Sequence, residues 1–469
     1  ILKDASATAV YGPRARDGVV VGTTKKGAMG SVDITVSQKV SIMTPSYKVK
    51  SMSIYDYALW RNEVAQANYV QTPPYSQEQL SKFYLGELYK KGVSYADMVG
   101  KVNAAHGTNY TLQNIQDMFD PNVSVGDNIQ DYYTYHDLWD LFDHVQPMSQ
   151  TNVSVRGGSE KLRYYSSLGY MKQKGVHKNF DFEQVNFLLN TEASLLNDKS
   201  LRLIMNLNGN TTMQKMPSIG ENVFREVVFW GNGGTKSLDN KWSTGLLRPN
   251  SPQAYMETGF NNTRQYRAQG TAGLKWNLPW VEGLTLTGTV NVSVSYNMNK
   301  QFNHPQLNVY ETPVSSKPNT YNSANANLYQ YWSDYLLTTG QVQADYGKKI
   351  KKHNFFVMLN YTSQVRHTNF TSAKREDYAT IFTPQINAGA KTTGTTGGET
   401  KWGSASWVGR LNYDYDSRYI LSYAANYNGS LSYSPDKRWG FFNAVSFAWV
   451  LSEEKFFKEV ISPEWVSMF

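Results

Sequence analysis

Much of the chain alternates between apolar and polar residues with a period of two. The clearest case is the segment Leu284–Tyr296, in which the even-numbered positions are mostly apolar and the odd-numbered positions carry small polar side chains. Successive side chains of a strand point to opposite faces, so this pattern predicts a strand with one face suited to lipid and one suited to water. The same alternation recurs in Val185–Leu195, Phe355–Tyr361 and Trp407–Tyr415.

The alternating segments are longer than the strands of a soluble sandwich. They run for about 11–18 residues, whereas globular strands are usually about 5–6 residues long and a tilted membrane strand needs about 9–11. Short turns are expected at 157–160, 197–199, 279–283, 347–352 and 416–417, and long loops near 42–149, 176–181, 216–262, 304–330 and 375–398. This layout, with short turns on one rim and long loops on the other, is typical of an outer-membrane barrel.

The first expected strand covers residues 31–41, and about twelve strands follow one another up to Leu451. The first long connection contains two predicted helices, 53–67 and 76–91, and then a loop rich in Gly and Asn. The predicted fold class is therefore all-β, a transmembrane antiparallel β-barrel of which about twelve strands lie in this sequence.

Composition narrows the choice of function further. Apolar residues make up 40% of the 469 residues and the mean hydropathy is −0.51, so a helical membrane protein is excluded. Aromatic residues reach 14%, with 33 Tyr and 12 Trp, which fits a barrel with aromatic girdles. The net charge of +8 comes from scattered residues rather than a basic stripe, which argues against a nucleic-acid partner.

The sequence contains no pattern of catalytic residues. It has no Cys, which excludes disulfides and thiolate metal sites, and no combination of nucleophile, base and acid stands out. We therefore expect no enzymatic activity, no cofactor and no metal. His136, Asp140 and His144 have the spacing of a helical stripe and Asp127, Asp131 and Asp137 are possible calcium ligands, but a solvated acidic loop is the favoured interpretation.

The first 27 residues carry the most specific motif. They combine a short predicted helix, Asp4–Val10, a glycine turn and a strand, Val19–Thr24. This stretch resembles the end of the plug domain in the SusC-like (SusC/RagA family) TonB-dependent transporters of Bacteroidetes outer membranes. The chain departs from the family at Ala15, Arg16 and Asp17, where Gly, Ala and Asn are usual. The matching residues are Lys3, Asp4, Ala5, Tyr11, Gly12, Arg14, Gly18, Val19, Val20, Thr23, Thr24, Lys25, Lys26 and Gly27.

Two later stretches, Asn152–Gly175 and Tyr413–Phe457, resemble the first hairpin and a later strand pair of the same family. The resemblance implies a barrel of about 22 strands around an N-terminal plug. Residues 1–27 would be the end of the plug, and 28–469 the first part of the barrel, with long extracellular loops near 42–149, 216–262, 304–330 and 375–398. Residue 1 is Ile rather than Met, so we expect this sequence to be part of a longer polypeptide.

The resemblance implies a cell outer-membrane protein that imports a nutrient with a SusD-like surface lipoprotein, driven by TonB. An oligosaccharide is the first choice of substrate and an oligopeptide the second. The alternatives are a SusC-like barrel that serves as a structural subunit of an assembly or export complex, and a soluble β-rich adhesin or carbohydrate-binding module. Aromatic side chains near the long loops are candidates for stacking on a ligand, or else belong to the outer girdle: Trp230, Trp242, Tyr255, Tyr331 and Trp332.

Overall fold

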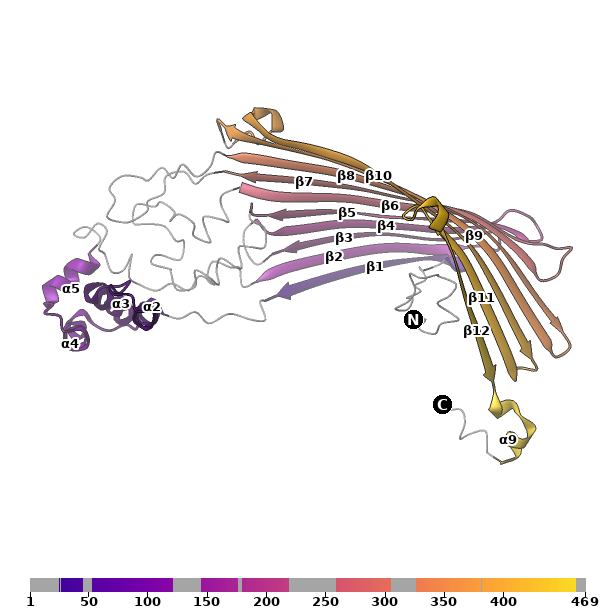
Figure 1. Ribbon diagram of the computed structural model, residues 1–469, viewed down its shortest axis with the longest axis horizontal. Coiled ribbons are helices and arrows are strands. Elements are labelled where there is room, and N and C mark those ends of the chain that lie inside the picture. The colour runs from indigo at the N-terminus through magenta and orange to yellow at the C-terminus, as the bar shows by residue number, and fades with distance from the viewer. Residues whose placement is uncertain are drawn as a thin grey trace.

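The computed structural model describes residues 25, 27–44, 53–120, 145–175, 179–218, 259–304, 326–380 and 382–460. Within these residues, twelve strands form one antiparallel sheet in which each strand pairs with its neighbours in sequence (Figure 1). The expected all-β class is confirmed. The strands are β1 Gly30–Met43, β2 Gln146–Gly158, β3 Leu162–Lys174, β4 Asp181–Ser194, β5 Leu201–Met216, β6 Gly259–Asn277, β7 Leu284–Asn303, β8 Asn327–Ile350, β9 His353–Tyr378, β10 Gly389–Tyr415, β11 Tyr419–Ser430 and β12 Trp439–Trp449.

The register divides the sheet into an apolar outer face and a polar inner face. On β7, Val290 lies opposite Ala272 and Gly340 and is 53% exposed, as expected of a side chain that faces lipid. Its neighbour Asn291 points to the other face, where its amide donates to the Thr271 hydroxyl at 2.7 Å. Paired residues on neighbouring strands point to the same face of the sheet. The apolar side chains of neighbouring strands therefore gather on the outer face.

All connections on one rim of the sheet are short and most of those on the other rim are longer, so the sheet has a short-turn rim and a long-loop rim. The short turns lie between β2 and β3, β4 and β5, β6 and β7, β8 and β9, and β10 and β11. Gly283, which ends the β6–β7 turn at a φ of +87°, has no room for a side chain because a Cβ atom would collide with the Gly347 carbonyl. The five short turns agree with the prediction, but the β3–β4 connection, expected among the long loops, has six residues, as many as the β4–β5 and β6–β7 turns.

One expected loop is largely strand. We expected a loop near 375–398, but β9 continues to Tyr378 and β10 begins at Gly389 (Figure 1). The first residues of β10 are mainly Thr and Gly and have no apolar face. Hydrophobic alternation marks only the part of a strand that faces lipid, whereas this extension depends on backbone pairing with β9.

The connection between β1 and β2 contains a unit of four helices at the long-loop rim: α2 Ile54–Ala67, α3 Gln77–Lys90, α4 Tyr95–His106 and α5 Leu112–Phe119. The first two were predicted, but the last two were expected to be a loop. Both helices are short, at 12 and 8 residues, and they depend on packing Met98, Val102 and Ile115 into a core shared with α2 and α3. No described helix is long and apolar enough to cross a membrane.

Short elements complete the described chain. They are the 3₁₀ turns η3 Ile386–Ala388, η4 Pro435–Lys437 and η5 Leu451–Glu453, and the helix α9 Lys455–Val460. The turn η4 lies in the β11–β12 connection, which is level with Gly403 in the middle of β10, while η5 and α9 follow β12 at the short-turn rim (Figure 1).

Candidate ligand-binding hollow on the inner face

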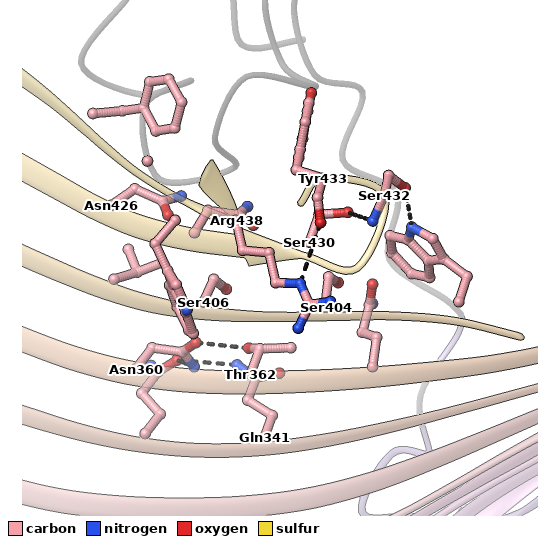
Figure 2. A pocket seen from close by; sticks show the side chains of 18 of the residues that line it. Gln341, Asn360, Thr362, Ser404, Ser406, Asn426, Ser430, Ser432, Tyr433 and Arg438 are labelled. Carbon is pink, nitrogen blue, oxygen red and sulfur yellow. Dashed lines mark hydrogen bonds between the residues drawn. The ribbon is translucent and has the colours of Figure 1, made fainter. Parts of the chain in front are cut away.

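The inner face of β8–β12 and the β11–β12 connection form a hollow of about 1030 Å³ (Figure 2). On β9–β11 its walls come from even-numbered residues, which the register places on one side of the sheet. Ser404, for example, lies between Gln364 of β9 and Ser430 of β11. Amide and hydroxyl groups therefore stand in rows across neighbouring strands, and such rows offer both donors and acceptors to a polar ligand.

Hydrogen bonds along the wall hold these side chains in place. The Thr362 hydroxyl donates to the Asn360 side-chain carbonyl at 2.8 Å, and the Asn360 amide donates to the Gln343 carbonyl at 3.2 Å (Figure 2). The Gln343 amide in turn donates to the Asp345 carboxylate at 2.8 Å. A wall whose polar groups are already oriented loses less conformational entropy when a ligand binds.

The edge of the hollow carries two aromatic rings, those of Trp402 and Tyr433. The Trp402 indole N–H donates to the Ser432 hydroxyl at 2.9 Å, and the Arg366 guanidinium lies 5.1 Å from the centre of the Trp402 ring. Tyr433 is 62% exposed, and its backbone carbonyl accepts a hydrogen bond from Arg438 Nε at 3.2 Å. Both rings stand beside the rows of polar side chains, where an apolar ring face can stack on a ligand.

The charges that line the hollow are all positive. Arg410, Lys437 and Arg438 contribute to the lining, which contains no carboxylate. Arg410 Nε donates to the Asn412 side-chain carbonyl at 3.1 Å, so its described partner is neutral. Among the described residues, none of the three cations forms an ion pair. The lining therefore combines neutral hydrogen-bonding groups with unpaired positive charge.

The predicted ligand-binding residues separate into two groups. Tyr331 lies on the inner face of β8, where its ring stacks on Phe370 with centres 6.2 Å apart. Trp332 lies on the outer face opposite Met298, a position that favours a role in the girdle. Neither residue lines the hollow. Trp230, Trp242 and Tyr255 lie outside the described residues.

Most of the predicted plug residues also lie outside the described part of the chain, namely Lys3, Asp4, Tyr11, Gly12, Arg14, Gly18, Thr23, Thr24 and Lys26. The two described ones contact the first strands. The Lys25 carbonyl accepts a hydrogen bond from the Asn190 amide of β4 at 2.7 Å. Gly27 lies against β3, where a Cβ atom would collide with the Tyr164 backbone. The segment that leads into β1 is therefore seated on the inner side of β3 and β4.

The metal hypotheses remain predictions. The candidate residues, from Asp127 to His144, lie outside the described residues. Among the residues that the structure does describe, no group of three ligating side chains is placed to hold a metal ion.

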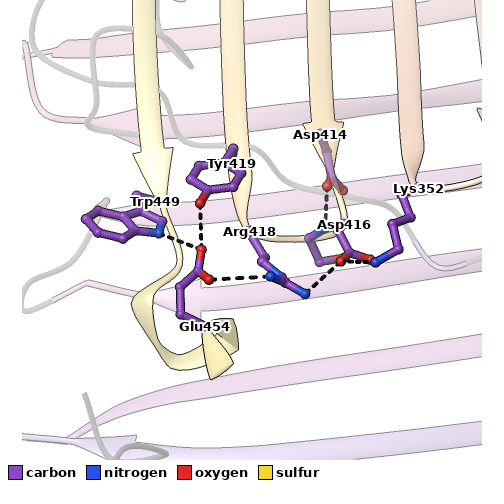
Figure 3. Close-up of polar contacts among 8 residues, drawn as sticks. Lys352, Asp414, Asp416, Arg418, Tyr419, Trp449 and Glu454 are labelled. Atoms are coloured by element: carbon purple, nitrogen blue, oxygen red, sulfur yellow. Dashed lines mark hydrogen bonds and ion pairs between the residues drawn. The ribbon is translucent and has the colours of Figure 1, made fainter. Parts of the chain in front are cut away.

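The short-turn rim carries a network of charges that ties β12 and the chain after it to the preceding hairpins (Figure 3). Lys352 lies 2.8 Å from Asp416, which also pairs with Arg418 at 2.8 Å. Arg418 in turn reaches Glu454 at 3.4 Å, and the Tyr419 hydroxyl donates to Glu454 at 2.7 Å. Lys352 lowers the pKa of Asp416, and the hydrogen bond from Tyr419 lowers the pKa of Glu454. Both carboxylates therefore stay ionised at neutral pH.

The hollow could not be recognised from the sequence pattern alone. The alternation of Trp407–Tyr415 places Arg410 on a polar face, and Arg438 falls within the stretch Tyr413–Phe457 that resembles the family, but neither residue was expected to bind a ligand. The alternation shows which residues share a face within one strand. Only the register shows which rows from five strands and one connection meet.

Comparison with known proteins places this geometry in context. No protein-family model matches the chain. The TonB-dependent receptor SusC of Bacteroides thetaiotaomicron is 24% identical over 485 aligned positions, covering 98% of this chain and 41% of the relative. The TonB-dependent receptor P39 of Formosa agariphila is also 24% identical, covering 98% of this chain and 38% of the relative. The resemblance to SusC-like TonB-dependent receptors is confirmed.

A solved structure shares the fold. The RagAB peptide transporter aligns with a TM-score of 0.68 at 18% identity, covering 97% of this chain and 49% of the matched chain. The same complex in its closed-closed state aligns with a TM-score of 0.67. The chain spans about two fifths of the length of the curated SusC-like relatives that it matches. The sheet is thus part of an outer-membrane β-barrel, which accounts for its apolar outer face.

Proposed function

We propose that this polypeptide is part of a TonB-dependent importer that carries an oligosaccharide across the outer membrane together with a SusD-like surface lipoprotein. The observation that carries the proposal is the polar hollow on the inner face of a sheet whose outer face is apolar. A barrel wall of this kind presents its binding groups to the interior and not to the lipid. Similarity to receptors named as TonB-dependent supports the energy source.

The chemistry of the hollow supports a sugar ligand. Sugar hydroxyls both donate and accept hydrogen bonds, and the side chains of Asn360, Thr362 and Ser404 offer both kinds of partner. Trp402 and Tyr433 provide ring faces beside these groups, and the apolar face of a sugar ring can pack on an aromatic ring. An oligopeptide, which also carries backbone amides, is the second choice.

In this proposal TonB supplies the energy that moves the plug. It pulls on the plug, and the plug has to leave the inner face before a ligand passes. The contacts of Lys25 with Asn190 and of Gly27 with Tyr164 support a plug that is attached to the sheet at β3 and β4. A surface lipoprotein would cover the long-loop rim, close the hollow on the outside and thereby hold the ligand while the plug moves.

Uptake measurements test the proposal. In cells that express the full-length protein, deletion of the segment that contacts TonB should abolish uptake of labelled oligosaccharides, while the purified complex still binds them. Uptake that survives the deletion would contradict the TonB-driven mechanism and favour the structural-subunit alternative. Binding and uptake of peptides but not of oligosaccharides would keep the importer and replace its substrate.

A further inference from the structure

The unpaired positive charge of the hollow narrows the class of ligand. Three cationic side chains line a space of about 1030 Å³ with no carboxylate among its lining residues. A cleft lined by charge of one sign concentrates the field and raises the local concentration of the opposite ion. Neutral sugars gain little from such a field, whereas an acidic ligand gains from it at every step of its approach.

A second hollow on the same face has the same character. It measures about 740 Å³ and is lined by residues of β4–β8, with Arg267 as its charged residue and no carboxylate in the lining. Its remaining polar groups are amides, hydroxyls and a phenol, among them Asn208, Gln269 and Ser293. Arg267 forms no ion pair among the described residues. The pattern of isolated cations among neutral hydrogen-bonding groups is thus repeated along the inner face.

The carboxylates of the inner face lie outside the two hollows, and several of them have partners of their own. Asp33 pairs with Arg156 at 2.7 Å, and Glu192 pairs with Arg202 at 3.0 Å. Asp345 accepts hydrogen bonds from the Gln343 amide and is not among the lining residues of either hollow. Neither hollow therefore has a carboxylate in its lining that would neutralise Arg410, Arg438 or Arg267.

We propose that the larger hollow selects acidic oligosaccharides, with their carboxylate or sulfate groups bound by Arg410 and Arg438 and their hydroxyls bound by the neighbouring amide and hydroxyl side chains. This inference rests on the proposed import of oligosaccharides and specifies their class. A guanidinium group fits the two oxygens of such an anion with paired hydrogen bonds. Arg438 also contacts the Tyr433 backbone, so ligand binding here would be coupled to the position of the β11–β12 connection.

A competition experiment tests the inference with defined probes. The full-length protein, purified with its membrane partner, is incubated with an equimolar mixture of tetrasaccharides of galactose, galacturonate and galactose sulfate. Retained sugars are then identified by mass spectrometry. We expect at least one acidic tetrasaccharide to be enriched about tenfold or more over the neutral one, because hydrogen bonds to charged groups are the stronger ones. The enrichment should fall as the salt concentration rises.

Variants assign the effect to the hollow. The double substitution Arg410→Gln with Arg438→Gln should abolish the enrichment, while Arg438→Lys, which keeps the charge, should preserve most of it. Lys401→Gln is the matched control, because Lys401 lies on the same strand as Arg410 but on the outer face, paired with Glu399 at 2.9 Å. The heat-modifiable mobility of each variant in gels reports whether its barrel has folded.

Each outcome decides a different point. Equal or better retention of the neutral tetrasaccharide, or an acidic preference that survives the double substitution, would overturn the inference and leave the import of oligosaccharides intact. Retention of no saccharide, together with binding of peptides, would overturn the substrate part of the proposed function and the inference with it.

Discussion

A lysine in place of Val290 tests which face of the sheet contacts lipid. A strand tilted by about 45° that rises about 3.3 Å per residue advances about 2.3 Å per residue along the membrane normal, so about 11 residues cross an apolar band about 25 Å tall. The alternating segment Leu284–Tyr296 is centred on Val290, which places this side chain near the midplane. Its paired neighbours on the outer face, Ala272 and Gly340, offer no group to bind an ammonium.

The expected cost of Val290→Lys is about 2–4 kcal/mol, the usual penalty for a lysine on the lipid face of a barrel at the midplane. Thr289→Lys is the matched control, because Thr289 occupies nearly the same depth on the inner face. There the ammonium reaches water, and we expect a change of about 0.5 kcal/mol or less. A difference of about 3 kcal/mol corresponds to roughly 150-fold in the folding equilibrium.

The assay follows the urea dependence of the folded, heat-modifiable fraction of the full-length protein in lipid vesicles. Val290→Leu, which keeps the side chain apolar, should behave like the parent protein and controls for the loss of Val. The assignment of faces would be wrong if the two lysine variants lost equal stability, or if Thr289→Lys were the weaker protein.

Three further predictions concern other parts of the chain. Leu85→Ala, at a fully buried position of the helical core, should lower the free energy of unfolding of the helical unit by about 2–5 kcal/mol and accelerate amide hydrogen exchange across α2–α5. Unchanged exchange rates would contradict this prediction. Gly27→Ala should reduce the folded fraction because its side chain would collide with β3, whereas Gly340→Ala, which has open space, should not; equal loss in both would refute the packing argument. Burial lowers the pKa of His106, so the unfolded unit binds a proton more readily than the folded one and stability should fall as the pH drops through about 6.5. Exchange rates of α4 at pH 7.5 and 5.5, corrected for intrinsic chemistry, should show this loss in the parent protein and not in His106→Gln.

The residues that escaped prediction share a physical cause. The helices α4 and α5 are only 12 and 8 residues long, and Met98 and Ile115 bury their side chains only because α2 and α3 provide the opposite wall. The first part of β10 consists mainly of Thr and Gly, and the long edge of β9 holds it in the sheet. In both cases the stabilising contact comes from residues outside the segment, so the pattern within the segment does not show it.

The hydrophobic alternation by itself determined the lipid-facing part of the strands and their two faces, because a strand in a membrane must place alternate residues in lipid and in water. Only the tertiary structure decided that Asn360, Ser404 and Arg438 line one hollow without a carboxylate. That grouping depends on the register of five strands and on the path of the β11–β12 connection. A period of two specifies a side of the sheet, but the position along the neighbouring strand is set by backbone pairing and turn length.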